Sequence, residues 1–284
     1  MVTRRGIGLL FTLVLLITIS LSAQEVYITN EPYQSLELLN LNTSPTQLST
    51  IYNIGGKPDD LILNSAGQLI YTVPTPGTVN LYDPTTGINT VLVSGLKYAR
   101  DLAIEPGGQT MLIAINTPGA IVRFNFATGT TTTLIKKLGT CDGIAYDPYG
   151  NLYAVANHNT IVQIDPVAGK ILNTLVLEPH SGINGGDGMT YDSYTGSLWV
   201  THDGKNFPYG LIEIPVTATG FAGGFSTYLT PKVSAPDGIK SDGKGNLYIG
   251  AIHTVAVYNI PTSTVTRNIT IQGADGVSLV PGTY

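Results

Sequence analysis

Short apolar runs, separated by polar turn residues, recur along most of the chain. The clearest example spans residues 142–153, where Asp-Gly leads into an apolar run, Pro-Tyr-Gly-Asn forms a turn signal, and Leu-Tyr opens the next run. Gly and Asn supply the positive φ angles that tight hairpin turns need. No helical periodicity follows the N-terminal segment, so the pattern predicts an all-β protein.

The same unit occurs six times. Its copies begin at positions 59, 100, 142, 187, 237 and 275, which gives spacings of 41, 42, 45, 50 and 38 residues. A repeat of about 40–50 residues made only of strands is typical of β-propeller blades. Residues 24–284 number 284 − 23 = 261, which six blades of about 43 residues fill completely. We therefore predict one domain over residues 24–284, a six-bladed β-propeller with four antiparallel strands per blade.

The two ends of the chain are expected to share the last blade. The copy at 275 has room for one strand before Tyr284, and three further strands are predicted at 26–29, 36–41 and 48–52, before the first complete blade. We therefore expect the last blade to be closed by the N-terminal strands plus the C-terminal strand, which removes an open sheet edge. Blade 4 is expected to carry an insertion, Asp203–Tyr209, between its second and third strands.

The first 23 residues are predicted to be a signal peptide. Arg4 and Arg5 precede an apolar stretch over residues 7–21, and Ser22-Ala23 provides a small-residue cleavage site. An uncleaved anchor is the alternative, but the stretch is shorter than the roughly 20 residues of a membrane span. We expect a secreted protein, extracellular or periplasmic, with no membrane span after signal cleavage.

Composition narrows the classes of partner. The chain has 12% charged residues and a net charge of −5, and nucleic-acid binding needs a basic face instead. Cys141 is the single cysteine, so we expect no internal disulfide and a small buried side chain rather than a reactive thiol.

One position of the repeat is charged in every copy. Innermost strands line the channel of a propeller, so the residues just before them should converge at one channel mouth. They are Asp59, Arg100, Asp142, Asp187, Asp237 and Asp275. Crowded carboxylates raise one another's pKa or recruit a cation, and oxygen ligands suit Ca²⁺ or Mg²⁺. A purely structural role, in which each Asp accepts backbone N–H bonds, is the alternative.

Two positions leave the assignment in the first blades open. Asp60 and Asp101 stand where the other copies have Gly, and blade 2 can be aligned one residue later, with Asp101 in the ring and Arg100 beside it. In either alignment Arg100 would offset part of the negative charge or bind an anionic substrate.

The loops between second and third strands should lie on the same face as the ring. They carry the polar candidates Glu31, Asn116, Asn157, His158, His202 and Asp203. We predict substrate contacts by Arg100, Asp142, Asn157 and Asp203. His202 is a candidate general base, and a surface histidine without a role is the alternative. The histidine spacings do not indicate a zinc site.

The repeated unit, Asp-Gly-Ile/Met followed by Gly-Asn-Leu-Tyr/Trp, resembles the repeats of the SMP-30/gluconolactonase/LRE-like six-bladed propellers and, more loosely, NHL repeats. The resemblance implies one divalent cation, often Ca²⁺, at the channel mouth. Its ligands would be the ring residues of the first, fourth and fifth blades, here Asp59, Asp187 and Asp237. Asp237, in Pro236-Asp237-Gly238, is also implied as the acid/base.

These observations lead to two functional hypotheses of different classes. The first is a secreted divalent-metal-dependent hydrolase of the lactonase or esterase type, with Asp237 and His202 as its catalytic residues. The alternative is a non-catalytic propeller that binds a small molecule or a protein partner on the same face. Lyase chemistry that uses His202 is a more distant third.

Overall fold

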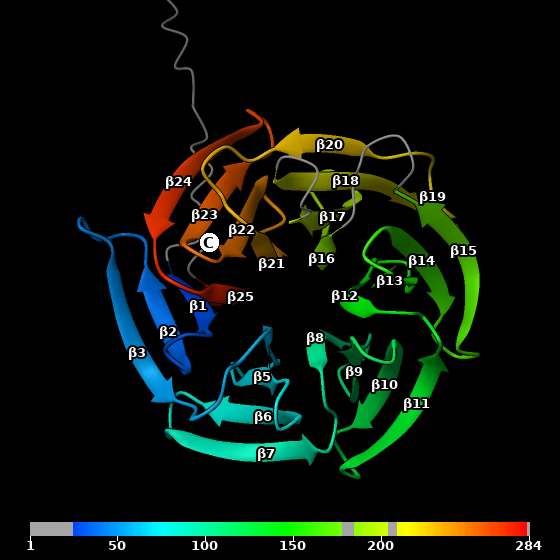
Figure 1. Cartoon of the computed structure of the whole chain (residues 1–284), viewed down its shortest axis with the longest axis horizontal. Coiled ribbons are helices and arrows are strands. Elements are labelled where there is room, and N and C mark those ends of the chain that lie inside the picture. Colours follow the sequence, from blue (N-terminus) through cyan, green and yellow to red (C-terminus); the bar gives the residue numbers. More distant parts are fainter. Residues whose placement is uncertain (1–24, 178–184, 204–208, 283–284) are drawn as a thin grey trace, which may run out of the picture.

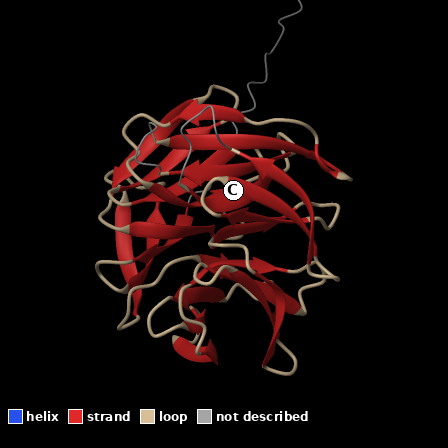
Figure 2. Ribbon diagram, turned by 45° about the vertical axis from the view of Figure 1, so that its right-hand side comes forward, coloured by secondary structure: helices blue, strands red, loops and turns tan. Residues whose placement is uncertain are grey.

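The computed structural model describes residues 25–177, 185–203 and 209–282. Six antiparallel sheets surround a central axis and form a six-bladed β-propeller (Figure 1). The described part contains strands and loops only (Figure 2), and no helix within it is long and apolar enough to cross a membrane. The predicted fold class is therefore confirmed.

Each blade places its strands in order from the axis outward. Blade 1 contains β4 (Leu61–Leu63), β5 (Leu69–Val73), β6 (Thr78–Asp83) and β7 (Ile88–Ser94). Blade 2 contains β8 (Ala99–Ile104), β9 (Thr110–Ile115), β10 (Ala120–Asn125) and β11 (Thr130–Lys136). Blade 3 contains β12 (Cys141–Tyr146), β13 (Leu152–Ala156), β14 (Thr160–Asp165) and β15 (Lys170–Val176).

Blades 4 and 5 continue this plan. Blade 4 contains β16 (Gly186–Asp192), β17 (Ser197–His202), β18 (Gly210–Thr217) and β20 (Ser226–Leu229), with the short β19 (Gly220–Phe221) added beside β18. Blade 5 contains β21 (Pro236–Ser241), β22 (Asn246–Ala251), β23 (Thr254–Asn259) and β24 (Thr264–Thr270). The predicted insertion lies between β17 and β18, and its residues 204–208 are outside the described ranges.

Blade 6 joins the two ends of the chain, as predicted. It contains β25 (Ala274–Leu279), β1 (Glu25–Asn30), β2 (Ser35–Asn40) and β3 (Gln47–Asn53). β25 pairs antiparallel with β1, and Val277 lies opposite Ile28 (Figure 1). The predicted signal peptide at residues 1–23 lies outside the described residues, and so does His180.

In blades 2 to 6 the innermost strands begin earlier than the sequence pattern predicted, whereas β4 of blade 1 begins at Leu61, after the ring position. In blade 3, Cys141 already pairs with Ala156, and the register then shifts before Ile144 pairs with Ala154. Asp142 and Gly143 therefore lie within a β-bulge of β12 rather than before it. Bulges re-aim side chains and are common beside functional sites; here the bulge turns the repeated Asp toward the channel.

The second half of the repeat forms the hairpin turn at the other end of this strand. Asp147 Oδ1 accepts hydrogen bonds from the backbone N–H groups of Tyr149 and Asn151, each at 2.9 Å. Gly150 adopts φ +87°, which glycine adopts without strain. Asp242 accepts the equivalent bonds from Lys244 and Asn246 in blade 5. The Gly-Asn signal therefore marks a turn that side chains cap.

Apolar side chains fill the six spaces between adjacent blades. Tyr153, Trp199 and Tyr248 occupy equivalent positions on second strands and are fully buried in this inter-blade core. Cys141 is also fully buried, and burial raises the pKa of its thiol well above the usual value. The described core thus accounts for the stability of a chain with one cysteine and no disulfide.

Candidate functional site

The innermost strands bring the six repeat positions together around the axis. β8, β12, β16, β21 and β25 end near one another at the centre of the ring of blades (Figure 1). We call Asp59, Arg100, Asp142, Asp187, Asp237 and Asp275 the mouth ring. The first five line one cavity at the centre of the propeller, and Asp275 lines an adjoining cavity together with Asp237.

Glycine after the ring residue lets neighbouring blades approach closely in blades 3 to 6. A Cβ atom at Gly188 would collide with the backbone carbonyl oxygen of Asp237, and one at Gly238 with that of Asp275. Gly143 and Gly276 have equally close backbone neighbours. Only a residue without a side chain fits there, so these glycines fix the diameter of the channel.

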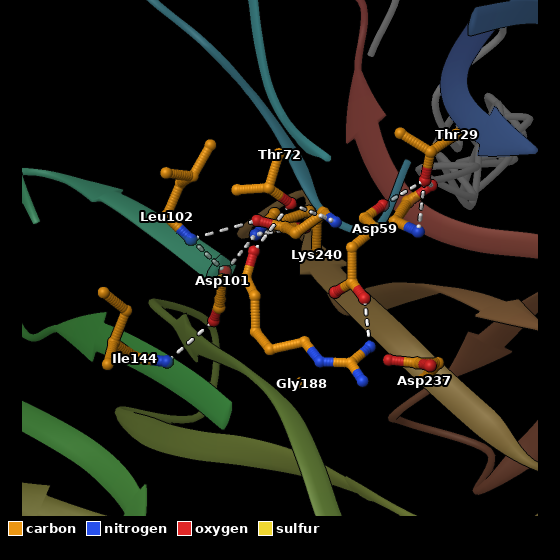
Figure 3. Close-up of polar contacts among 12 residues, drawn as sticks. Thr29, Asp59, Thr72, Asp101, Leu102, Ile144, Gly188, Asp237 and Lys240 are labelled. Carbon is orange, nitrogen blue, oxygen red and sulfur yellow. Dashed lines mark hydrogen bonds and ion pairs between the residues drawn. The ribbon is translucent and has the colours of Figure 1, made fainter. Parts of the chain in front are cut away.

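Threonines on second strands hold the backbone of the ring. Thr72 Oγ1 donates to the carbonyl oxygen of Arg100 at 2.9 Å, Thr29 donates to that of Asp59, and Thr201 donates to that of Asp237. Figure 3 shows Thr29 and Thr72 in these positions. Three of the six ring residues are therefore fixed by the blade that precedes them.

Arg100 forms an ion pair with Asp59, its neighbour in the ring. Its Nη1 donates to Asp59 Oδ2, and the side chain of Asp59 is only 9% exposed (Figure 3). Burial raises the pKa of Asp59 to about 7, although Arg100 acts in the opposite direction. The attraction of Asp59 in turn raises the pKa of Arg100, and Asp187 and Asp237 add to it. Arg100 is thus the fixed positive charge of the ring.

Asp142 is held on one side only. Its Oδ1 accepts a hydrogen bond from Asn116 Nδ2, while its buried Oδ2 has no hydrogen-bond partner among the described residues. His158 Nδ1 lies 3.3 Å from this Oδ2, an ion pair only if the histidine is protonated. Burial raises the pKa of Asp142. A buried acceptor without a hydrogen-bond donor is costly, so a donor at this oxygen would stabilise the site.

The remaining carboxylates repel one another. Burial raises the pKa of Asp187 well above its usual value, and the charges of Asp237 and Asp142 raise it further. The pKa of Asp275 is raised in the same way, first by burial and then by the charges of Asp237 and Asp59. The ring therefore has more negative charge than Arg100 neutralises, and it favours protons or a cation.

A second charged cluster, the lower triad, closes the channel below the ring. Lys240 Nζ lies 3.7 Å from Asp60 Oδ1 and 3.9 Å from Asp101 Oδ1 (Figure 3). Asp60 also accepts a hydrogen bond from the N–H of Leu102 at 3.2 Å, and Asp101 from that of Ile144 at 2.7 Å. The two carboxylates, which replace glycine, therefore bridge to the next blade where glycine would make direct contact.

Three cavities adjoin the ring. The central cavity has a volume of about 20 Å³, which is room for about one water molecule. The side cavity is about 220 Å³ and is lined by Glu31, Asp203, Ala235, Asp237, Ile252, Gly273, Ala274 and Asp275. The rim cavity is about 450 Å³, and its lining includes Glu31, Lys57, Tyr98, Asp59 and Arg100. Asp237 thus lines both the central and the side cavity.

The residues implied as metal ligands share a cavity but do not form a ready ligand set. Asp59, Asp187 and Asp237 all line the central cavity. Among the described residues, however, no three His, Cys, Asp or Glu side chains are arranged to hold one ion. Asp59 is occupied by Arg100. The present donor set therefore does not fit the divalent cation that the resemblance implies.

The other predicted site residues lie at different depths. Asp203 lines the side cavity, and burial and Asp237 raise its pKa. Asn157 is exposed, and its Oδ1 lies against Gly139 of the neighbouring loop. His202 ends β17, is 2% exposed and lines none of the three cavities, and burial lowers its pKa. Of these three, Asp203 alone borders the cavities of the ring.

Lys240 was not among the residues predicted from the sequence. It occupies the strand position three residues after Asp237, where the other copies have Ile62, Ala103, Ala145, Thr190 and Ser278. A single charged residue in a row of small or apolar channel positions was the available signal. Lys240 also lines a cavity of about 460 Å³ at the opposite end of the channel, so the lower triad separates the two ends.

Comparisons with known proteins support the propeller fold but do not assign the chain to a family. No protein-family model matches the chain, and no curated protein sequence matches it. Similar solved structures include a chain of the nidogen/laminin complex, with 14% identity, a TM-score of 0.74, and coverage of 91% of this chain and 98% of that one.

Two bacterial structures are similar over comparable lengths. Virginiamycin B lyase from Staphylococcus aureus has 16% identity and a TM-score of 0.63 over 90% of this chain and 86% of its own. TolB from Acinetobacter baumannii has 13% identity and a TM-score of 0.65 over 92% of this chain and 67% of its own. At such identities the likeness shows a shared propeller fold and no shared activity.

Proposed function

We propose that this protein is a secreted, non-catalytic propeller whose channel mouth binds a small cationic molecule. The observation that supports this most directly is the composition of the side cavity. Glu31, Asp203, Asp237 and Asp275 line it, together with four small or apolar residues, and no basic side chain is among its described lining residues. Secretion rests on the predicted signal peptide at residues 1–23.

The electrostatics of the side cavity favour a positive charge. The pKa values of Asp203 and Asp275 are raised first by burial and also by the charge of Asp237. A bound ammonium group would stabilise the ionised form of both carboxylates. Glu31 is the exception, because Lys57 already lies 3.1 Å from it. Asp142 Oδ2, which has no hydrogen-bond partner among the described residues, is a further acceptor within the ring, outside the side cavity.

The size of the cavity limits the ligand. A volume of about 220 Å³ is below the roughly 300–1,000 Å³ of sites for drug-sized ligands. The apolar surfaces of Ile252 and Ala235 suit a short alkyl chain. We therefore propose a simple alkylamine or the amine end of a larger molecule.

Calorimetric titration with three compounds of equal length tests the proposal. Putrescine has two ammonium groups, butanediol is neutral and succinate has two carboxylates. We expect heat of binding with putrescine only, weakened by salt, and at least about tenfold weaker binding in Asp203→Asn. Glu25→Gln is the control, since Glu25 starts β1 at the far end of the channel. Binding of succinate, or of none of the three, would contradict the proposal.

Metal-dependent hydrolysis of a lactone or ester is the second candidate. The observation that favours it is that Asp59, Asp187 and Asp237, the residues implied as metal ligands, line one cavity, although Asp59 is paired with Arg100. Its test is the hydrolysis of gluconolactone by the purified protein in calcium and after chelation. Turnover that chelation abolishes would favour the hydrolase over the binding protein.

A further inference from the structure

Arg100 stands at a position that is acidic in every other blade. Asp59, Asp142, Asp187, Asp237 and Asp275 occupy the equivalent places. In the structure the guanidinium of Arg100 reaches across the gap between blades to Asp59 (Figure 3). The single departure from the acidic pattern therefore inserts a positive charge among the negative ones.

The environment of Arg100 includes the three residues implied as metal ligands. Asp59 is its direct partner, and Asp187 and Asp237 line the same central cavity as Arg100. Both are close enough to Arg100 to stabilise its charge, after Asp59. The guanidinium thus takes the electrostatic place that a divalent ion would take among these carboxylates.

The space beside the guanidinium is too small for a conventional metal centre. The central cavity retains about 20 Å³, whereas Ca²⁺ takes about 6–8 oxygen ligands and often keeps bound waters. Arg100 lines both this cavity and the rim cavity, so it lies between the carboxylates and the entrance. An ion that came from the rim cavity would therefore have to pass the Arg100 guanidinium.

We infer that Arg100 is a tethered cation that replaces a divalent metal ion in the mouth ring. This inference does not depend on the proposed amine ligand, because that ligand occupies the side cavity. It explains why Asp59, Asp187 and Asp237 lie together without forming a ligand set for an ion. It also means that neither calcium nor a chelator should change the positive charge within the ring, because that charge belongs to the Arg100 side chain.

Removal of the guanidinium should create a metal site. We expect the wild-type protein to give no heat with calcium chloride and no change in Tm. Arg100→Gln should bind calcium at least about tenfold more tightly than the wild type, and calcium should raise its Tm. Arg100→Lys keeps a cation and should behave like the wild type. Lys57→Gln, which removes a positive charge on the same face outside the ring, is the matched control and should also remain indifferent.

The outcomes separate clearly. Calcium binding by the wild type as tight as that by Arg100→Gln would overturn the inference. The same holds if folded Arg100→Gln binds no calcium, with folding monitored by circular dichroism. If Arg100→Gln folds only in the presence of calcium, the inference is supported. If it stays unfolded with and without calcium, the inference is contradicted, because an ion should then restore the ring. None of these readouts involves the amine titration, so the two proposals can fail independently.

Discussion

The two sides of the channel solve the same packing problem in different ways. On the glycine side, blades 3 to 6, Gly143, Gly188, Gly238 and Gly276 bring adjacent backbones into direct contact. On the aspartate side, blades 1 and 2, Asp60 and Asp101 bridge to the next blade through side-chain hydrogen bonds. The glycine side needs no charge for this contact, whereas the aspartate side places two carboxylates in the channel.

The difference shows which blades carry charged residues that depart from the repeat. The aspartate side supplies Asp60, Asp101 and Arg100, and each meets a partner of opposite charge in the channel. Lys240 from blade 5 lies against the first two, and Asp59 lies against Arg100. Each charged residue that departs from the repeat therefore has a partner of opposite charge. The Arg100–Asp59 pair lies on one side of the central cavity, and the lower triad lies on the other.

Disrupting the backbone contacts of the glycine side should have the largest effect on stability. Gly188→Ala places a Cβ against the carbonyl oxygen of Asp237, which cannot move without shifting the blade. We expect a loss of about 3 kcal/mol in the free energy of unfolding, measured with urea. Gly223→Ala is the control, because no atom lies within 4 Å of its added Cβ; it should change stability by less than about 0.5 kcal/mol. Equal effects at the two sites would mean that the glycine contacts are not tight.

Breaking the aspartate side should cost somewhat less. Lys240→Met leaves Asp60 and Asp101 without their cation, although each keeps a backbone N–H donor, and we expect a loss of about 2 kcal/mol in the free energy of unfolding. Adding Asp60→Asn removes one of the stranded charges. The double variant should therefore be more stable than the sum of the two single effects predicts, by about 1 kcal/mol in a double-mutant cycle. Strict additivity would show that Lys240 and Asp60 do not interact.

The acidity of the ring predicts an unusual dependence on pH. Asp59, Asp142, Asp187 and Asp275 have raised pKa values in the folded protein, that of Asp59 reaching about 7 against an ordinary value of 3.8. The folded state therefore binds more protons than the unfolded state. The stability from these protons is present below about pH 4 and is lost as the pH rises through about 7.

Two substitutions sharpen this prediction on opposite sides of the ring. At pH 8, Asp187→Asn should raise Tm by roughly 2–4 °C, equivalent to about 1 kcal/mol, because it removes a repelling charge. Asp59→Asn should give no such gain, since it also leaves Arg100 without its partner. Differential scanning calorimetry between pH 5 and 8 would measure both, with Glu25→Gln as the control. A larger gain from Asp59→Asn would contradict the ion pair.

The smallest effect is expected at the threonines behind the ring. Thr201→Val removes the bond to the Asp237 carbonyl oxygen and should cost about 0.5–1 kcal/mol. Thr201→Ser keeps the hydroxyl and should cost less. Val155 already occupies the equivalent position in blade 3, so the fold tolerates the change. A loss as large as that of Gly188→Ala would mean that this bond, and not the glycine contact, holds the blades together.

The fold was predictable because every blade repeats the same local signals. The turn at Asp147 and Asn151, the buried Tyr153 and the closure by β25 and β1 all follow from strand periodicity and turn chemistry. The bulge that contains Asp142 and Gly143 could not be predicted from these local signals, because it depends on the pairing of Cys141 with Ala156 across the hairpin. Sequence spacing gives the order of strands more reliably than the exact residue at which each begins.

The site was predictable only as a set of positions. The convergence of Asp59, Arg100 and Asp237 follows from the repeat, and all three line one cavity. The ion pair between Arg100 and Asp59 did not follow, because it is a side-chain contact between blades. Lys240 was missed because it lies outside the repeated dipeptide. His202 looked available in a loop, but it is buried at the end of β17.

The most direct test of the central claim is a crystal structure of the wild-type protein, determined from crystals grown in excess calcium chloride. The claim is that Arg100, and not a metal ion, is the cation of the mouth ring. We predict density for the Arg100 guanidinium against Asp59, with no ion bound by Asp59, Asp187 and Asp237. A calcium ion coordinated by these three carboxylates, with Arg100 displaced toward the rim, would contradict it.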